Sequence, residues 1–423
     1  MSNPQQRPPL NTVLPPLILG TATFNTQYVA DPLSMPYRDI VARAIALGVN
    51  AFDTSPYYGP SEILLGTALK ALMKPVPTES NPTPVPLPRS SFKLITKAGR
   101  IGSEEFDYSP AYIRYSVLRS LQRLHTPYLD LVYTHDVEFV SPDEVVGAVR
   151  ELRRLRDEEG LIRYVGISGY PVDVLCSLAE KILAETGEPL DAVLSFCHFT
   201  IQDRTLGLPL VDTGDNDPAS PLSRLKAAGV NVVLNASMLG MGLLTSKGIP
   251  ADPVPSGAES DSPLAKWHPS PPELRLACKE LARIAEASGE RLESVAIRWS
   301  LEEWARVGAL AEVSVPSGTA KVGASVCGVS SIAELEETVK EWRGVLSGKD
   351  STAGYEPDSE RREKVMRLVK EKMWPALGRW KDYAWQSPRA GYVNRRRPED
   401  RGQVPDDGVI ATHECSKAAG GVS

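Results

Sequence analysis

The chain has 423 residues, of which 42% are hydrophobic and 24% are charged, and this ordinary globular composition excludes a wholly disordered protein. Its 47 Lys and Arg residues against 53 Asp and Glu residues give a formal net charge of −6, so we expect no basic surface for nucleic acid. At roughly 100–200 residues per domain, the length allows two or three domains, or one large barrel with additions.

The sequence predicts neither a membrane segment nor a metal site. The first ten residues lack the apolar stretch of a secretory signal, and the most apolar region, 227–244, is interrupted by Asn231, Asn235 and Ser237. Five cysteines without a C-x-x-C pair are typical of reduced thiols, and the five histidines are too scattered to share a helix face. We therefore expect a cytoplasmic protein with no membrane partner and no metal. The oligomeric state is not indicated.

Short apolar runs alternate with helical patterns along most of the chain, which is typical of βα units around a parallel sheet. The eight runs are Leu17–Gly20, Val49–Phe52, Phe92–Thr96, Leu129–Tyr133, Tyr164–Ile167, Ala192–Phe196, Val230–Leu234 and Val326–Val329. A tandem series of eight favours a closed (β/α)8 barrel, the TIM barrel, over an open doubly wound sheet.

Helix boundaries are marked by capping residues. Ser109 followed by Pro110, and later Pro142, predict the first turns of two helices. Gly48 and Gly229 each stand between a helical pattern and the next apolar run, where a left-handed cap is required.

Residues beyond the usual ~250 of such a barrel fall into recognisable segments. We predict that the barrel unit spans 14–385 and that 74–90, which contains six prolines, is an exposed insertion. From Gln386 the composition turns to Arg, Gly, Asp and Ser, so we expect 386–423 to be a disordered tail.

Four reactive side chains follow consecutive apolar runs, at the barrel end where parallel barrels carry their chemistry. Asp53 ends the second run, Tyr58 lies in the loop that follows, Lys97 ends the third run and His135 comes just after the fourth. Each alone has an ordinary structural interpretation, but together they predict a catalytic site.

The chemistry of these four side chains is mutually consistent. A tyrosine phenol has a pKa of ~10, and a nearby ammonium favours the phenolate. Lys97 can supply that cation, Asp53 can keep it charged and aimed at Tyr58, and His135 can hydrogen-bond a substrate oxygen. Because neither a nucleophile nor a metal is needed, the pattern points to proton transfer coupled to hydride transfer with a nicotinamide.

Three stretches resemble the catalytic signature of the aldo-keto reductase superfamily, with agreement in order, spacing and flanking residues. They are Asp53–Gly66, Leu94–Lys97 and Leu131–His135. The resemblance implies that Tyr58 is the general acid/base, that Lys97 and Asp53 tune it, and that His135 orients the substrate. Two further stretches, Leu194–Phe199 and Asn235–Leu244, are most similar to the branch of D-arabinose 1-dehydrogenases and L-galactose dehydrogenases. That branch implies an aldose substrate.

The resemblance also implies a dinucleotide site, although no G-x-G-x-x-G follows a strand. It implies Ser168 for the nicotinamide amide and the loop from Ser237 through Leu239 to Gly242 for the pyrophosphate. For the adenosine end it implies Gly328, Ser330, Ser331, Glu334, Glu337 and Thr338. The alternative for Ser330 and Ser331 is a plain cap of the last helix, which would not exclude anion contact.

Three positions depart from the family pattern. Glu334 stands where NADP-preferring relatives usually have Arg or Gln, Thr338 replaces the usual Asn, and Gly169 stands where an Asn often helps to hold the nicotinamide. A carboxylate near a 2′-phosphate would repel it while suiting a free 2′-hydroxyl. We therefore expect NAD as the cofactor, with NADP less favoured, and work in the oxidative direction.

The sequence thus predicts an NAD-dependent aldose 1-dehydrogenase of the D-arabinose type, with Tyr58 taking the proton as hydride leaves C1 and an aldonolactone as product. Alternatives within the same chemistry are L-galactose oxidation and NADPH-dependent carbonyl reduction. An alternative of another class is a non-catalytic, nucleotide-sensing subunit, as occurs on this fold in potassium-channel β subunits.

Overall fold

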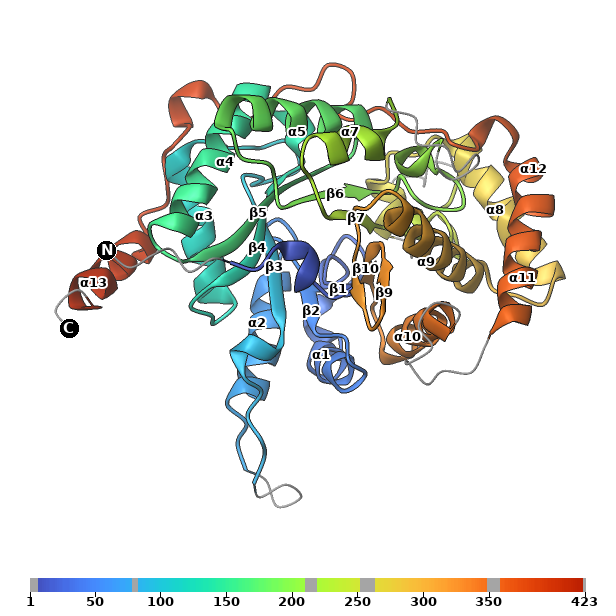
Figure 1. The fold of residues 1–423 in the computed structure, drawn as a ribbon, viewed down its shortest axis with the longest axis horizontal. Coiled ribbons are helices and arrows are strands. Elements are labelled where there is room, and N and C mark those ends of the chain that lie inside the picture. The colour runs from blue at the N-terminus through green and yellow to red at the C-terminus, as the bar shows by residue number, and fades with distance from the viewer. Residues whose placement is uncertain (1–6, 78–82, 210–218, 252–262, 348–357, 421–423) are drawn as a thin grey trace.

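The computed structural model describes residues 7–77, 83–209, 219–251, 263–347 and 358–420. Eight parallel strands close into a barrel in the order β1-β10-β7-β6-β5-β4-β3-β2 (Figure 1). The strands are β1 (Leu17–Gly20), β2 (Ala51–Asp53), β3 (Lys93–Ala98), β4 (Leu129–His135), β5 (Ile162–Gly169), β6 (Ala192–Phe196), β7 (Val233–Ala236) and β10 (Ala324–Gly328). The expected TIM barrel is confirmed.

The strands begin and end a few residues away from the predicted runs, because an apolar run indicates that side chains are buried and not that the backbone is paired with a neighbouring strand. Val49 and Val230 are buried, but their backbone N–H groups bond to Ala44 and Leu225 at the end of the preceding helix. Pairing therefore begins only after these residues have closed the helical turn.

Helices surround the barrel, each with an apolar face against the strands (Figure 1). They are α1 (Tyr37–Ala46), α2 (Ser61–Met73), α3 (Pro110–Arg123), α4 (Pro142–Asp157), α5 (Val172–Thr186), α7 (Pro221–Ala227), α8 (Pro272–Ala287), α9 (Leu292–Leu310) and α10 (Ile332–Ser347). Ser109 caps α3, as predicted, and Ser141 forms a capping box before α4. Gly48 and Gly229 have φ of +87° and +80°, which confirms the predicted left-handed positions.

The N-terminal end of the barrel is closed by two short elements. Leu10 of the 3₁₀ turn Leu10–Thr12 and Val315 of β8 (Val315–Ser317) belong to the apolar cluster of the barrel interior. The hairpin of β8 and β9 (Ala320–Val322) was not predicted, because its strands of three residues are too short to show alternation. Because these elements cover the N-terminal end, the C-terminal end of the strands remains open for a functional site.

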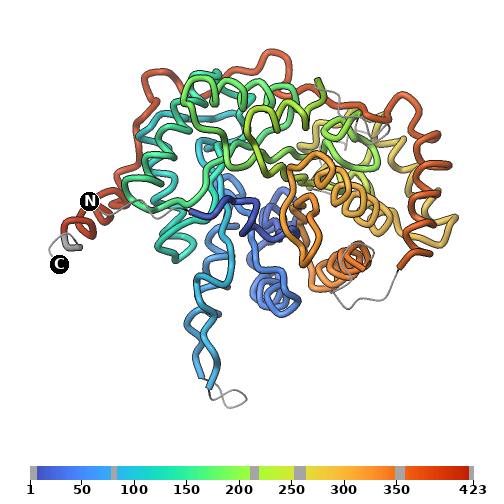
Figure 2. The backbone as a smooth tube through the Cα atoms, viewed as in Figure 1, coloured from blue at the N-terminus to red at the C-terminus, as the bar shows by residue number. Residues whose placement is uncertain are grey.

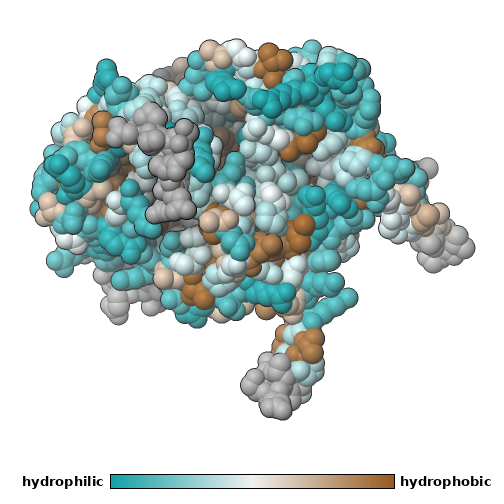
Figure 3. Space-filling model, turned by 180° about the vertical axis from the view of Figure 1, so that it is seen from behind, coloured by the Kyte–Doolittle hydropathy of each residue, from teal (hydrophilic) through white to brown (hydrophobic). Residues whose placement is uncertain are grey.

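The proline-rich insertion projects as an arm from the connection between α2 and β3 (Figure 1). Helix-to-strand connections lie at the N-terminal end of a βα barrel, so the arm is remote from the strand ends expected to carry the site. Val76 and Val85 on its described part are 79% and 88% exposed, consistent with the predicted exposure, and residues 78–82 lie outside the described ranges. Figure 3 also shows apolar residues on the described part of the arm, beside hydrophilic ones.

A C-terminal extension follows the barrel and is anchored to it by ion pairs. It contains α11 (Ser359–Leu368), α12 (Trp374–Leu377) and α13 (Val409–Gly420), and runs from α12 across the top of the view to α13 (Figure 2). Arg298 of α9, with a side chain only 1% exposed, binds Asp358 at 2.6 Å, and Arg204 binds Asp382 at 2.7 Å. The extension is therefore packed against the barrel helices and loops.

The expectation that 386–423 is disordered is wrong for the described residues 386–420. Asn394 exchanges two hydrogen bonds with the backbone of Phe106, at 3.0 and 2.8 Å, and Arg396 pairs with the buried Asp107. Val409 is buried against α3. A composition poor in apolar residues indicated disorder, but polar groups such as Asn394 and Arg396 also hold this segment, and composition does not reveal their partners.

Candidate active site

The strand ends bring Asp53, Lys97 and His135 together at the open end of the barrel. Asp53 ends β2, Lys97 lies near the end of β3 and His135 ends β4, and none is more than 4% exposed. The Lys97 ammonium donates to Asp53 Oδ1 at 2.5 Å and to the backbone oxygen of Thr54 at 2.9 Å. Burial lowers the pKa of Lys97, but Asp53 and Tyr58 together raise it above its usual value, so Lys97 stays charged.

Tyr58 completes the group from the loop after β2. Lys97 Nζ lies 4.9 Å from the centre of the Tyr58 ring, and its charge acts to lower the pKa of the phenol. The structure therefore brings together all four residues that the sequence singled out. Burial raises the pKa of Tyr58 and outweighs the lowering by Lys97, so the net direction of the pKa shift is opposite to the expected one.

His135 is held as a neutral imidazole. Burial, together with Lys97 and Arg100, lowers the pKa of His135 well below its usual value. Ser55 Oγ lies 3.0 Å from Nδ1, and the His135 ring meets the Tyr58 ring edge-on with the ring centres 5.6 Å apart. A neutral imidazole beside a phenol can hydrogen-bond a substrate oxygen without competing for the proton that Tyr58 carries.

One wall of the site was not predicted. The Arg100 guanidinium lies 3.6 Å from the centre of the Tyr57 ring and forms an ion pair with Asp136. Asp136 directly follows His135, and Arg100 comes three residues after Lys97, so proximity to the predicted residues was the available signal. The pairing fixes a cation against an aromatic face beside Tyr58.

A second wall comes from the C-terminal extension. Trp385 stacks on Tyr170, with ring centres 4.8 Å apart at 16°, and meets the ring of His268 edge-on at 5.3 Å. Tyr170 follows β5 directly and lies two residues after Ser168. The extension therefore lies beside a residue expected to hold the cofactor.

Glu138 joins this extension to the loop after β4. Its Oε1 accepts hydrogen bonds from Ser387 Oγ at 2.9 Å and from the Tyr170 backbone at 3.3 Å. Burial, with a contribution from Asp136, raises the pKa of Glu138 to about 8. Glu138 is thus a neutral acid near pH 7.

This raised pKa predicts a stability that falls with pH. Between the usual glutamate pKa and about 8, unfolded chains lose the Glu138 proton while folded chains keep it, so unfolding becomes easier as pH rises through that window. Glu138→Gln retains the acceptor but cannot ionise. We expect the Tm of the wild type to fall more than that of Glu138→Gln between pH 5 and pH 8, in thermal scans followed by circular dichroism; parallel curves would contradict the assignment.

The residues expected at the nicotinamide and pyrophosphate lie around the same opening. Ser168 is buried and its hydroxyl donates to Thr134 at 3.2 Å. In the loop after β7, Ser237 and Gly242 have φ of +58° and +104°, and Leu239 precedes the 3₁₀ turn Gly240–Gly242. Left-handed residues beside right-handed ones are typical of anion sites, but the N–H groups of Gly240, Gly242 and Leu243 already donate to backbone oxygens of this loop.

At the start of α10, the expected adenosine residues form a cap. Ser331 Oγ accepts from the Glu334 backbone at 3.2 Å, while the Glu334 carboxylate accepts from the Ser330 backbone at 2.7 Å and from Ser330 Oγ at 2.9 Å. The capping interpretation of the serines therefore holds. The carboxylate occupies the N–H donor that would otherwise be offered to an anion. Gly328 ends β10 just before this cap.

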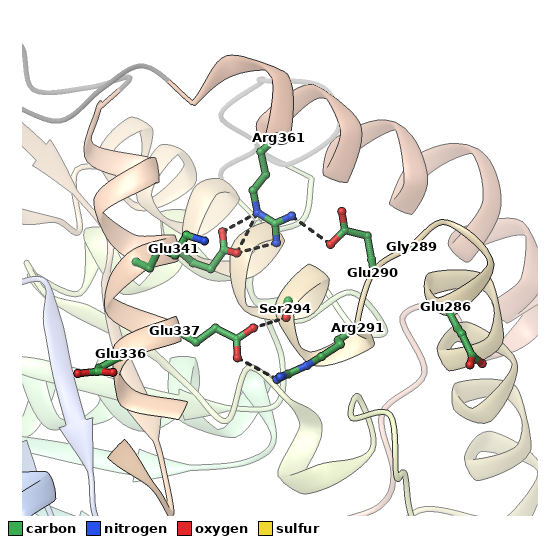
Figure 4. Close-up of a pocket in the computed structure, with 10 residues that line it drawn as sticks. Glu286, Gly289, Glu290, Arg291, Ser294, Glu336, Glu337, Glu341 and Arg361 are labelled. Carbon is green, nitrogen blue, oxygen red and sulfur yellow. Dashed lines mark hydrogen bonds and ion pairs between the residues drawn. The ribbon is translucent and has the colours of Figure 1, made fainter. Parts of the chain in front are cut away.

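The last two expected cofactor residues face elsewhere. Glu337 binds Ser294 and, at 2.9 Å, Arg291 of the turn before α9, in the groove between α9 and α10 (Figure 4). Thr338 is 3% exposed and packs inward. In the structure Glu337 is paired with residues of the α9 end of this groove and not with the Ser330–Glu334 cap.

The described residues contain no group of three or more His, Cys, Asp or Glu side chains arranged to hold a metal ion. Among the same residues, no helix combines the length and apolarity needed to span a membrane.

Comparison with known proteins shows which family the chain resembles. The model of the aldo/keto reductase family matches residues 16–353. The chain is 38% identical to the D-arabinose 1-dehydrogenase of Saccharomyces cerevisiae over 343 residues, covering 79% of this chain and 87% of the relative. It is 32% identical to the L-galactose dehydrogenase of Arabidopsis thaliana over 339 residues, covering 79% and 86%. Among solved structures, a glycerol dehydrogenase from Gluconobacter oxydans is similar in fold, with a TM-score of 0.53 and 22% identity over 90% of this chain and 96% of that one.

Proposed function

The chain belongs to the aldo/keto reductase family, a family of nicotinamide-dependent oxidoreductases acting on small molecules, and from that premise we propose that it is an NAD-dependent aldose 1-dehydrogenase. The observation that carries the proposal is that buried Lys97 binds Asp53 while its Nζ lies 4.9 Å from the centre of the Tyr58 ring. The relative at 38% identity, a D-arabinose 1-dehydrogenase, supports an aldose as substrate. A cytoplasmic location remains part of the proposal.

In the proposed reaction, Tyr58 as phenolate takes the proton of the anomeric hydroxyl while hydride leaves C1, and the cyclic sugar becomes an aldonolactone. Bound NAD⁺ supplies the hydride acceptor and a positive charge. Lys97 stabilises the phenolate, and neutral His135 donates to or accepts from the sugar oxygen and fixes its direction. Ser168 and the 237–242 loop would hold the nicotinamide and pyrophosphate.

The preference for NAD is supported by the cap of α10. The Glu334 carboxylate binds both the backbone and the hydroxyl of Ser330, so a 2′-phosphate approaching this turn would meet a negative charge and a donor already in use. A free 2′-hydroxyl can instead donate to a carboxylate.

The direct test is a matrix of initial rates with D-arabinose, L-galactose and other aldoses, each with NAD⁺ and NADP⁺. The proposal expects the highest kcat/KM with D-arabinose and NAD⁺, and lactone as the first product. L-galactose is the second candidate, because the relative at 32% identity is an L-galactose dehydrogenase. A chain that reduces carbonyl compounds with NADPH but oxidises no aldose would refute the proposal.

Glu334 gives a specific prediction for coenzyme choice. Glu334→Arg replaces the repelling charge with one that pairs with a 2′-phosphate, and we expect the ratio of kcat/KM for NAD⁺ over NADP⁺ to fall by about tenfold or more. Glu336→Arg, two residues along α10, makes the same charge change away from the cap and is the control. A tenfold or greater preference of the wild type for NADP⁺ would show our interpretation of Glu334 to be wrong.

A further inference from the structure

Two buried polar atoms lie beneath the catalytic group without a hydrogen-bond partner among the described residues. They are Asp53 Oδ2 and the hydroxyl oxygen of Tyr133, whose residues are 4% and 0% exposed. A buried polar atom left unpaired destabilises the folded protein, so two such atoms in one layer of the interior are expected to pair with one another. Tyr133 has no part in the proposed reaction described above.

The strand register places Asp53 and Tyr133 in the same layer of the barrel interior. Asp53 pairs across with Ile95, and Ile95 with Leu131. Because the strands tilt, residues at one height along the barrel axis are shifted by about one residue from each strand to the next. Strand β4 is two strands from β2, so Tyr133, two residues beyond Leu131, lies at the height of Asp53. Tyr133 belongs to the interior cluster, and Asp53, two residues after the interior Ala51, points inward as well.

The surroundings leave Asp53 as the polar partner within this layer. The same register gives the layer its other two side chains, Leu194 and Val326, which are apolar. Gly166 on the neighbouring strand makes room for the ring, since a Cβ there would lie 2.8 Å from Tyr133 Cδ1. The Tyr133 ring is thus accommodated in the barrel interior, where burial and the charge of Asp53 raise the pKa of its phenol.

Resting on the proposed function, we propose that Tyr133 is a positioning residue whose phenol donates a hydrogen bond to Asp53 Oδ2. The bond forms after a small side-chain shift or through one buried water. It reduces the negative charge that Asp53 presents to Lys97 and Tyr58. Asp53 Oδ1 is already bound by Lys97, so the second oxygen is free to accept. Lys97 Nζ in turn lies 4.9 Å from the centre of the Tyr58 ring, so Asp53 and Lys97 stand between Tyr133 and the residue that transfers the proton.

The sign of the effect follows from the charge of Asp53. That charge raises the pKa of Tyr58, and a donor that withdraws part of it lowers that pKa. Without the Tyr133 hydroxyl the pKa of Tyr58 rises, and the acidic limb of aldose oxidation moves to higher pH. The other charged or titratable groups facing Tyr58 are the same in both proteins; they are Lys97, Arg100, Asp136, His135, Tyr57 and Tyr28.

The test compares Tyr133→Phe with Tyr164→Phe. Tyr164 is also an interior tyrosine, but its hydroxyl donates to Pro8 at 2.6 Å near the N-terminal end of the barrel, so it controls for the loss of any buried hydroxyl. We expect Tyr133→Phe to move the acidic limb of kcat/KM for oxidation upward by about half a pH unit or more, and Tyr164→Phe to leave it in place. An unchanged limb in Tyr133→Phe, or an equal shift in both variants, would overturn the proposal.

A second measurement needs no turnover. In protein labelled with ¹³C at the tyrosine phenol carbon, the resonances of Tyr133 and Tyr58 are assigned by their loss in the two phenylalanine variants. Asp53→Asn is expected to shift the Tyr133 resonance, and Tyr133→Phe to move the Tyr58 titration to higher pH. If no aldose is oxidised, the proposed function is wrong, but this titration still tests the role of Tyr133. If the Tyr133 resonance does not respond to Asp53→Asn, the role of Tyr133 is wrong and the proposed function is unaffected.

Discussion

Tyr58→Phe is expected to lower kcat for aldose oxidation by about 10²–10⁴-fold while leaving NAD⁺ affinity nearly unchanged. The phenylalanine ring fills the same space against His135 and Lys97 but has no oxygen to take the sugar proton. Oxidation at C1 then has to release that proton to water, from a site whose surrounding groups are buried. Steady-state rates and NAD⁺ titration by tryptophan fluorescence measure the two quantities separately.

Tyr57→Phe is the matched control, since Tyr57 is the neighbouring residue and its hydroxyl accepts from Gln27 at 3.2 Å rather than from Lys97. We expect that variant to lose less than about tenfold in kcat, because only a positioning bond is removed. The comparison also separates the enzyme from the nucleotide-sensing alternative. A sensing subunit would bind NAD⁺ in all three proteins and show no appreciable turnover in the wild type.

The barrel and the four central residues could be predicted from the sequence because both follow from short-range pattern. Each strand of the barrel is buried on both faces and therefore reads as an apolar run, and Asp53, Lys97 and His135 are recognisable as the reactive residues at the ends of such runs. Tyr58 was found by its position in the following loop. Parallel strands bring these ends together without further information.

What could not be predicted depends on contacts between distant segments. Trp385 meets Tyr170 across 215 residues, and Arg396 meets Asp107 across 289, so neither contact leaves a local signature. The pKa of Tyr58 also escaped prediction, because the sequence identifies the cation but not how deeply the phenol is buried. Similarly, the capping role of Glu334 was not foreseen, because Glu334 was interpreted only as a cofactor residue and not as a partner of Ser330.

Lys97→Met is the second large effect, and it is expected to damage activity and stability together. Methionine has similar length but no charge, so Tyr58 loses its cation and kcat is expected to fall by about 10²–10⁴-fold. Asp53 is left buried without its partner, and breaking a buried pair in this way costs about 3–5 kcal/mol of unfolding free energy. Denaturant unfolding monitored at several pH values measures the second loss.

The pH dependence of that loss has a definite sign. Burial already raises the pKa of Asp53, and removing Lys97, which opposes that effect, raises it further. A raised carboxyl pKa makes folding less favourable as pH increases, so the deficit of Lys97→Met should be smaller near pH 5 than near pH 8.

Asp53→Asn combined with Lys97→Met removes both charges and should recover much of the stability at every pH while recovering none of the activity. If the double variant were as unstable as Lys97→Met, the cost would lie in packing and not in the unpaired carboxylate. If instead it regained turnover, the cation would not be what activates Tyr58, and the proton-transfer role assigned to this pair would have to be abandoned.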